Sequence, residues 1–232
     1  MSVKIYIAAH KDFPWCPDNK DYTIVCGDGE LKNKYPVDVI KEHNTKLYTD
    51  LHDSYAELTR LRYIQMYVKP MTDYVGFCQY KRYFDFYDKT DCIENIMKHH
   101  DAILPAAVSQ GPNVIEAYGR YHRKEDILHC IDIVKKNFPH MSKSADIAMK
   151  AKAIRANNMF VMKRKDFYDY CYFLFNIFDT YNRENGWKTM DDIKNSGCKQ
   201  FKTHGFLAER LSNIFFTERF KTPVSKGIII KR

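Results

Sequence analysis

The sequence has few of the features that mark membrane, secreted or metal-stapled proteins. No run of about eighteen uncharged apolar residues occurs, and the N-terminal MSVKIYIAAHKDF has no small-residue cleavage site. Seven cysteines are present without a C-x-x-C pair, which argues against a zinc ribbon or a disulfide framework. With only 9 Gly and 8 Pro, no stretch is typical of a linker. We therefore expect residues 1–232 to form one ordered cytoplasmic domain with reduced thiols.

Several catalytic signatures are also missing. The chain contains no G-x-S-x-G, G-x-x-x-x-G-K or G-x-G-x-x-G, so serine hydrolases, P-loop kinases and dinucleotide oxidoreductases lack their local motifs. It contains no Asp-x-Asp either. The nearest pair of hard oxygen ligands is Asp28 and Glu30, and we interpret that segment as an ordinary Gly-Asp turn. We accordingly favour a site without a cofactor or metal ion, with Asp28 and Glu30 as the alternative ligands.

The sequence has an excess of positive charge. A formal charge of +8 and a pI near 9.0 favour an anionic partner. Lysines and arginines are spread along the chain and form no basic arm, so a dedicated nucleic-acid-binding protein is not expected. A phosphorylated small molecule or an anionic membrane surface remains compatible with this charge.

Hydrophobic patterning predicts an α/β fold. Short apolar runs at Val3–Ala9, 22–26, 74–78 and 102–104 are typical of strands. Apolar residues spaced by three and four predict a helix from Leu51 to Val68, stopped by Pro70, and a further helix at 93–100. This alternation indicates a mainly parallel central sheet with helices on both faces. Ligands of such sheets bind outside the carboxyl ends of the strands.

The second half continues in the same way. The spacing predicts helices over 125–136, 165–182 and 204–216, and strands over 158–162 and 227–230. The helix at 165–182 carries enough aromatic residues to be part of the core.

Two predicted strand ends carry side chains suited to a nucleotide. Lys81 and Arg82 follow the third strand and could neutralise a diphosphate, although solvated charges at a strand end are the alternative. Ala8 and Ala9 end the first strand and would let a flat base or a ribose approach closely. His10 at this rim could equally be a surface histidine.

Five blocks of sequence carry a family resemblance. They read KIYIAAHKDF, YAELTRLRY, DYVGFCQYKRYFDF, NNMFVMKRKDFYDYCYFLFNIF and HGFLAERL, in this order over nearly the whole chain. The chain resembles a domain-of-unknown-function family of capsular and exopolysaccharide gene clusters, whose members look like GT-A-type glycosyltransferases. Some members are regarded as β-galactofuranosyltransferases. The family's third block usually reads Gly-x-x-His-Tyr-Arg-Arg-Tyr-Phe, so Gln79 and Lys81 depart from it.

The resemblance implies a GT-A-like fold and the transfer of a sugar, such as galactofuranose, from a UDP-sugar. The acceptor would be a glycan or lipid-linked glycan of capsule, exopolysaccharide or O-antigen synthesis. Work at the inner face of the cell membrane, by peripheral contact, is compatible with this. Two alternatives stay open: a nucleic-acid- or anionic-glycan-binding module without catalysis, and a nucleotide-sugar hydrolase. The predicted nucleotide-sugar contacts are Ala8, Ala9, His10, Gln79, Tyr80, Lys81, Arg82 and Tyr83.

Transfer with inversion needs a carboxylate that takes the proton of the acceptor hydroxyl. Glu209 is the predicted base and Asp85 the alternative, while an ion pair with Arg210 is the structural interpretation of Glu209. Glu57 has Arg60 three residues later, so a surface ion pair is as plausible there as a role in the site. The predicted acceptor or sugar contacts are Asn157, Asn158 and His204.

Overall fold

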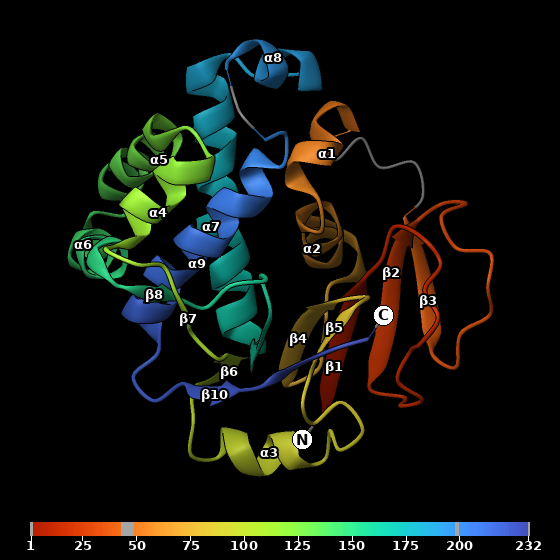
Figure 1. Cartoon of the computed structure of the whole chain (residues 1–232). Helices are drawn as coiled ribbons and strands as arrows, with labels where there is room; N and C mark the ends of the chain where they lie inside the picture. Colours follow the sequence, from red (N-terminus) through yellow and green to blue (C-terminus); the bar gives the residue numbers. More distant parts are fainter. Residues whose placement is uncertain (1, 43–48, 198–199, 232) are drawn as a thin grey trace.

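A computed structural model describes residues 2–42, 49–197 and 200–231, and its centre is a twisted mixed sheet (Figure 1). The strand order is β10-β6-β9-β4-β1-β2-β3, with β5 and β11 attached beside β4. The strands of this sheet are β1 Val3–Ala8, β2 Tyr22–Gly27, β3 Asp38–Glu42, β4 Tyr74–Gln79, β5 Arg82–Phe84, β6 Ala102–Pro105, β9 Phe160–Lys163, β10 Val224–Lys226 and β11 Ile228–Ile230. A separate antiparallel pair joins β7 Val108–Ser109 to β8 Ala153–Ile154.

Parallel pairing dominates the part of the sheet that carries the predicted strand ends. β1 runs parallel to both β2 and β4, and its register places Ala8 opposite Gln79. The exits of β1 and β4 are therefore neighbours. Only β9 runs against both of its neighbours in the main path, β4 and β6.

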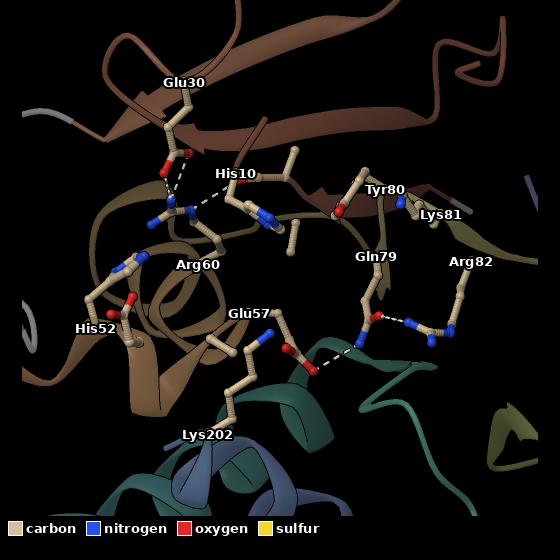
Figure 2. A pocket seen from close by; sticks show the side chains of 14 residues that line it. His10, Glu30, His52, Glu57, Arg60, Gln79, Tyr80, Lys81, Arg82 and Lys202 are labelled. Atoms are coloured by element: carbon tan, nitrogen blue, oxygen red, sulfur yellow. Dashed lines mark hydrogen bonds and ion pairs between the residues drawn. The ribbon is translucent and has the colours of Figure 1, made fainter. Parts of the chain in front are cut away.

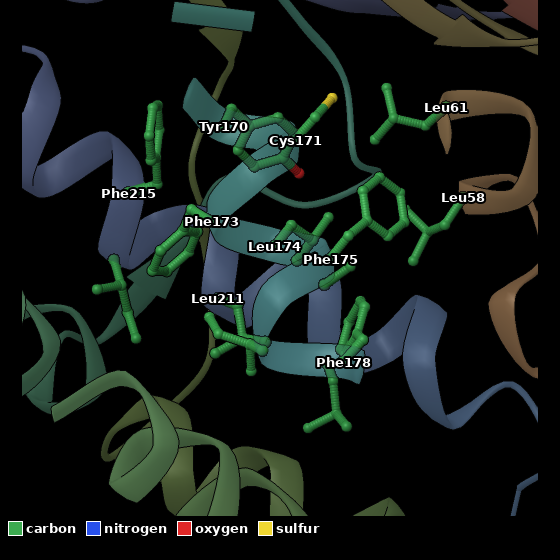
Figure 3. Packing of buried hydrophobic residues seen from close by; sticks show 14 of the residues in the cluster. Leu58, Leu61, Tyr170, Cys171, Phe173, Leu174, Phe175, Phe178, Leu211 and Phe215 are labelled. Carbon is green, nitrogen blue, oxygen red and sulfur yellow. The ribbon is translucent and has the colours of Figure 1, made fainter. Parts of the chain in front are cut away.

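Helices cover one face of the sheet in several layers. Alternate residues of β1 divide between the two faces: Tyr6 and Ala8 join the helix-covered core, and Ile5 and Ile7 join the core of the other face. Figure 3 shows the first core, where α7 packs its aromatic side chains against α9 and α2. The helices on this side of the sheet are α1 His52–Tyr55, α2 Leu58–Tyr63, α4 Val114–Tyr121, α5 Lys124–Asn137, α6 Ser142–Lys150, α7 Arg164–Asn185, α8 Met190–Asn195 and α9 Thr203–Arg219.

The other face is covered more thinly. Ile93 and Met97 of helix α3, Cys92–Met97, pack there with Phe13 and with Tyr83 of β5. The predicted α/β architecture, a mostly parallel central sheet with helices on both faces, is thus confirmed.

The helix predicted from Leu51 to Val68 is broken where the site is built. A 3₁₀ turn, Thr49–Leu51, leads into α1, which ends at Tyr55. α2 begins at Leu58 and continues as a π-helical turn, Ile64–Val68. Ala56 between α1 and α2 has φ 50° and ψ −125°. The apolar spacing could not reveal this break, because one residue of unusual backbone leaves the period of three to four intact.

Ala56 lies in a backbone region that glycine enters freely and that costs an L-residue about 1–3 kcal/mol. Ala56→Gly is therefore expected to raise the free energy of unfolding by about 1 kcal/mol, after the added chain entropy of glycine is subtracted. Urea titration would measure this. The control, Ala148→Gly inside α6, is expected to lower that free energy by about 1 kcal/mol or more. A loss of stability in both variants would contradict strain at Ala56.

Two further features concern the described residues alone. None of their helices combines the length and apolar character needed to cross a membrane. The cysteines at 16, 26, 78, 92, 130 and 171 are free thiols, and Cys198 lies outside the described residues.

Candidate active site

A cavity of about 470 Å³ opens at the carboxyl ends of β1 and β4, where the fold class places ligands. It lies between the sheet edge and the segment that joins α1 to α2 (Figure 2). Its lining comes from five stretches of chain that are distant in sequence. The lining residues are Ala8, Ala9, His10, Glu30, His52, Asp53, Ala56, Glu57, Arg60, Gln79, Tyr80, Lys81, Arg82 and Lys202.

The β1 exit forms the floor of this cavity. The backbone N–H of Tyr80 donates to the carbonyl of Ala8 at 3.1 Å, which holds the turn after β4 against β1. The N–H of Ala9 donates to the carbonyl of Val25 at 3.0 Å. The rings of His10 and Tyr80 meet edge to face, with their centres 5.0 Å apart. The pKa of His10 is lowered, chiefly by burial. The structure thus brings two groups of predicted nucleotide-sugar contacts, Ala8–His10 and Gln79–Arg82, into one cavity.

Arg60 lines one wall of the cavity and forms an ion pair with Glu30. Its side chain is 3% exposed, and the guanidinium donates to Glu30 at 2.7 Å and to Glu42 at 2.7 Å. Burial raises the pKa of Glu42 to about 7, against the opposing effect of Arg60. Glu30 also accepts from the N–H of Gly27 at 2.6 Å. The carboxylate of Glu30 is thus an ion-pair partner of Arg60 and is not free to act as an open metal ligand.

Among the described residues, no group of three or more His, Cys, Asp and Glu side chains is arranged to hold a metal ion. Of the two residues considered for a divalent ion, Asp28 is exposed and does not line the cavity.

Glu57 extends into the cavity and is held by uncharged amides. Its Oε1 accepts from Gln79 Nε2 at 2.8 Å and from Asn158 Nδ2 at 2.9 Å. Gln79 Nε2 also donates to the carbonyl of Asn157 at 3.1 Å, and Gln79 Oε1 accepts from Arg82. Burial is the largest cause of a raised pKa at Glu57. The ion pair with Arg60 that the sequence suggested is not formed, since Arg60 turns to Glu30 and Glu42.

Besides Arg60, whose charge is paired with Glu30 and Glu42, three cations supply positive charge to the cavity. Lys81, Arg82 and Lys202 line it, and none of them pairs with a carboxylate within the described part of the chain. Lys81 lies over the ring of Tyr80, with Nζ 5.5 Å from the ring centre. Lys202, which directly precedes α9, extends toward Glu57 from the opposite side (Figure 2). The cavity therefore combines a positively charged side with one carboxylate, Glu57, that is hydrogen-bonded by neutral amides.

The structure does not bring the two predicted catalytic carboxylates into the cavity. Glu209 Oε1 accepts from the N–H of Asn157 at 2.9 Å, and its Oε2 pairs with Arg210 at 2.8 Å. Asp85 is exposed and accepts from the N–H of Gly227 at 3.1 Å. The ion-pair interpretation of Glu209 is what the geometry shows.

Two other predicted contacts lie in the protein core. Tyr83 is 0% exposed on the far face of the sheet, and its hydroxyl donates to the carbonyl of Tyr80. His204 is 0% exposed and bonds Ser54 and Asn182. A ring without accessible surface cannot contact a sugar directly, so burial corrects both predictions. Asn158 is also buried and its amide donates to Glu57, while the backbone carbonyl of Asn157 accepts from Gln79.

Sequence reasoning missed Lys202, His52 and Asp53 and underrated Glu57. No local motif marks them. Asp53 and Glu57 are four residues apart and would share one face even of an unbroken helix, and no sequence pattern marks the break at Ala56 between them.

Comparisons with known proteins agree with this fold. The structure resembles the apo structure of WbbM, described as a bifunctional glycosyltransferase, with a TM-score of 0.79 and 22% sequence identity. The match covers 100% of this chain and 46% of WbbM, so the chain spans less than half of that protein. A search of curated proteins finds no match. A family model matches residues 4–220. The chain belongs to the family described as "Domain of unknown function (DUF4422)".

Proposed function

We propose that this chain is a glycosyltransferase that binds a nucleoside diphosphate sugar in the cavity and transfers the sugar to a glycan acceptor. The observation that carries the proposal is the set of three cations without carboxylate partners in the described chain, Lys81, Arg82 and Lys202, at the exits of β1 and β4. Sheets of this class bind nucleotides at that edge. The likeness to the WbbM fold supports the same class of reaction.

In this proposal the diphosphate lies against the cations and the nucleoside against Ala8, Ala9 and His10. The bond between the anomeric carbon and the diphosphate oxygen breaks while an acceptor hydroxyl oxygen bonds to that carbon. Negative charge grows on the leaving diphosphate, where Lys81 and Arg82 stabilise it. Because Arg60 engages Glu30, we propose that these cations do the work that a metal ion does in related enzymes.

UDP is the proposed nucleotide, and galactofuranose the first sugar to test, because of the family resemblance. The proposed acceptor is a glycan or lipid-linked glycan of polysaccharide synthesis. A binding module for anionic polymers could use the same cations, but it would have no use for a desolvated carboxylate beside them. Glu57 therefore favours the enzyme over the module.

A thermal-shift panel tests the proposal. UDP-galactofuranose, UDP-galactose, UDP-glucose and UDP-N-acetylglucosamine are added with and without EDTA, and UDP release is followed in parallel. A donor at about 100 times its Kd stabilises the folded state by about 2.7 kcal/mol, which raises Tm by roughly 5–10 °C at this chain length. UMP is the control and is expected to give a smaller shift, since it lacks the second phosphate.

The results separate the candidate functions. Stabilisation by no sugar nucleotide would overturn the proposal, and stabilisation by single-stranded RNA or an anionic glycan alone would favour the binding module. UDP release that ends on addition of EDTA would contradict the metal-independent site. Release at the same rate with and without any glycan acceptor would favour a hydrolase.

A further inference from the structure

Three carboxylates line the cavity among the described residues, and their surroundings differ. Glu30 is paired with Arg60, and Asp53 is exposed to solvent. Glu57 alone is bound by neutral amide donors, Gln79 Nε2 and Asn158 Nδ2, both on its Oε1. Its Oε2 accepts no hydrogen bond from another described residue. An ion pair would lower the pKa of a carboxylate further than neutral donors do, and at Glu57 the effect of burial, which raises the pKa, outweighs the lowering by the Asn158 amide.

The unusual backbone of the molecule gathers around the same carboxylate. Four described non-glycine residues have positive φ, and three of them adjoin Glu57: Ala56 at 50°, Asn157 at 72° and Asn158 at 50°. Ala56 turns Glu57 away from the course of α1. The left-handed turn at Asn157 and Asn158, which asparagine adopts at low cost, supplies one amide donor and the carbonyl that orients the other. Unusual backbone of this kind clusters at functional sites.

The amide of Gln79 joins this carboxylate to the proposed diphosphate site. Arg82 donates to Gln79 Oε1, and Gln79 Nε2 donates to Glu57. The Gln79 side chain is thereby fixed in one orientation by partners at both ends. Lys81, next to Arg82, and Lys202, across the cavity, complete the positive side. The contacts from Arg82 through Gln79 to Glu57 thus fix the carboxylate of Glu57 relative to the cations of the proposed diphosphate site.

We propose that Glu57 is the catalytic base of the transfer, with Gln79 and Asn158 as its positioning residues. The inference rests on the proposed function. Glu57 takes the proton of the acceptor hydroxyl as that oxygen attacks the anomeric carbon. The electron pair of the broken bond leaves with the diphosphate toward Lys81, Arg82 and Lys202. Water in the place of the acceptor hydroxyl would be activated in the same way and give slow donor hydrolysis.

Glu57→Gln tests this with almost no change of shape. The affinity for UDP, measured by the thermal shift, is expected to stay within a few-fold of wild type, because the cations that bind the diphosphate remain. The rate of UDP release from the sugar nucleotide is expected to fall by about 10²–10⁴-fold. The loss of rate that wild type shows as pH falls through the raised pKa of Glu57 should be absent from the residual activity. Glu125→Gln, an exposed glutamate on α5, is the matched control and should match wild type.

A second variant guards against a folding defect. Glu57→Asp keeps the charge and withdraws it by one methylene. This variant should still bind UDP, and it should form UDP from the sugar nucleotide at least tenfold more slowly than wild type. A Glu57→Gln protein that binds UDP and turns over at the wild-type rate overturns the assignment of the base and leaves the glycosyltransferase proposal intact. A wild-type protein that binds no sugar nucleotide overturns both.

Discussion

Replacing Lys81 and Arg82 together with alanine is expected to lower kcat/KM for the sugar nucleotide by about 10³-fold or more. Loss of one donor to developing negative charge typically costs about 10²–10³-fold in rate, and two neighbouring cations act on the same diphosphate. Both side chains line the cavity and neither is paired with a carboxylate of the described chain. Initial rates of UDP release at several donor concentrations would give the constants.

The two single variants should differ in a way that the structure defines. Lys81 Nζ lies over the ring of Tyr80, so Lys81→Ala should act mainly through weaker donor binding and a higher KM. Arg82 also donates to Gln79, which orients Glu57, so Arg82→Ala should lower kcat as well. Lys165→Ala is the control, since Lys165 pairs with Asp169 on α7 and lies outside the cavity. A double variant within tenfold of wild type would show that the diphosphate binds elsewhere.

The fold was predictable because its signals are local. The runs at 3–9, 22–26 and 74–78 are buried on both sides, and such runs predict strands of a covered parallel sheet. The strand-exit rule then located the cavity, since Ala8 and Gln79 are register partners. The weakly apolar edge strand β3 and the reversed direction of β9 were not foreseen. Strand direction depends on how a connection packs, and no residue pattern within the strand encodes it.

The catalytic carboxylate was harder to predict for a physical reason. Glu57 and Glu209 both stand one or three residues from an arginine on a helix, so sequence spacing gives both the same ion-pair interpretation. In the structure the two glutamates differ because other carboxylates compete for the arginine near Glu57 and no described carboxylate displaces the arginine next to Glu209. Arg210 stays with Glu209, whereas Arg60 is drawn to Glu30 and Glu42 and leaves Glu57 to the amides. The residues that compete are distant in sequence: Arg60 lies 30 positions from Glu30 and 18 from Glu42, and Glu57 lies 101 positions from Asn158.

The strongest effect on stability is expected from His204, which joins the helices behind the cavity. Its ring stacks on Tyr55 of α1 at 4.1 Å, Nδ1 bonds Ser54 Oγ at 2.6 Å, and Nε2 bonds Asn182 Oδ1 at 2.7 Å. His204→Ala leaves a cavity and two buried polar groups without their partner. The free energy of unfolding should fall by about 3–5 kcal/mol, which lowers Tm by roughly 10 °C. Urea and thermal denaturation measure this, and exposed His140→Ala should change it by less than about 0.5 kcal/mol.

His204 also predicts how stability depends on pH. Burial lowers its pKa to about 3, whereas an unfolded histidine titrates near 6.5. Between these values the unfolded chain binds a proton that the folded chain does not, so the free energy of unfolding declines as pH falls from about 6.5 toward 3. His122, with a pKa lowered to about 4, acts in the same direction. His204→Gln removes the contribution of His204, so the difference in the free energy of unfolding between wild type and this variant should narrow steadily on acidification. A difference that stays constant from pH 7 to pH 4 would mean that His204 is not buried as a neutral ring, and the connection between α1 and the start of α9 would need another explanation.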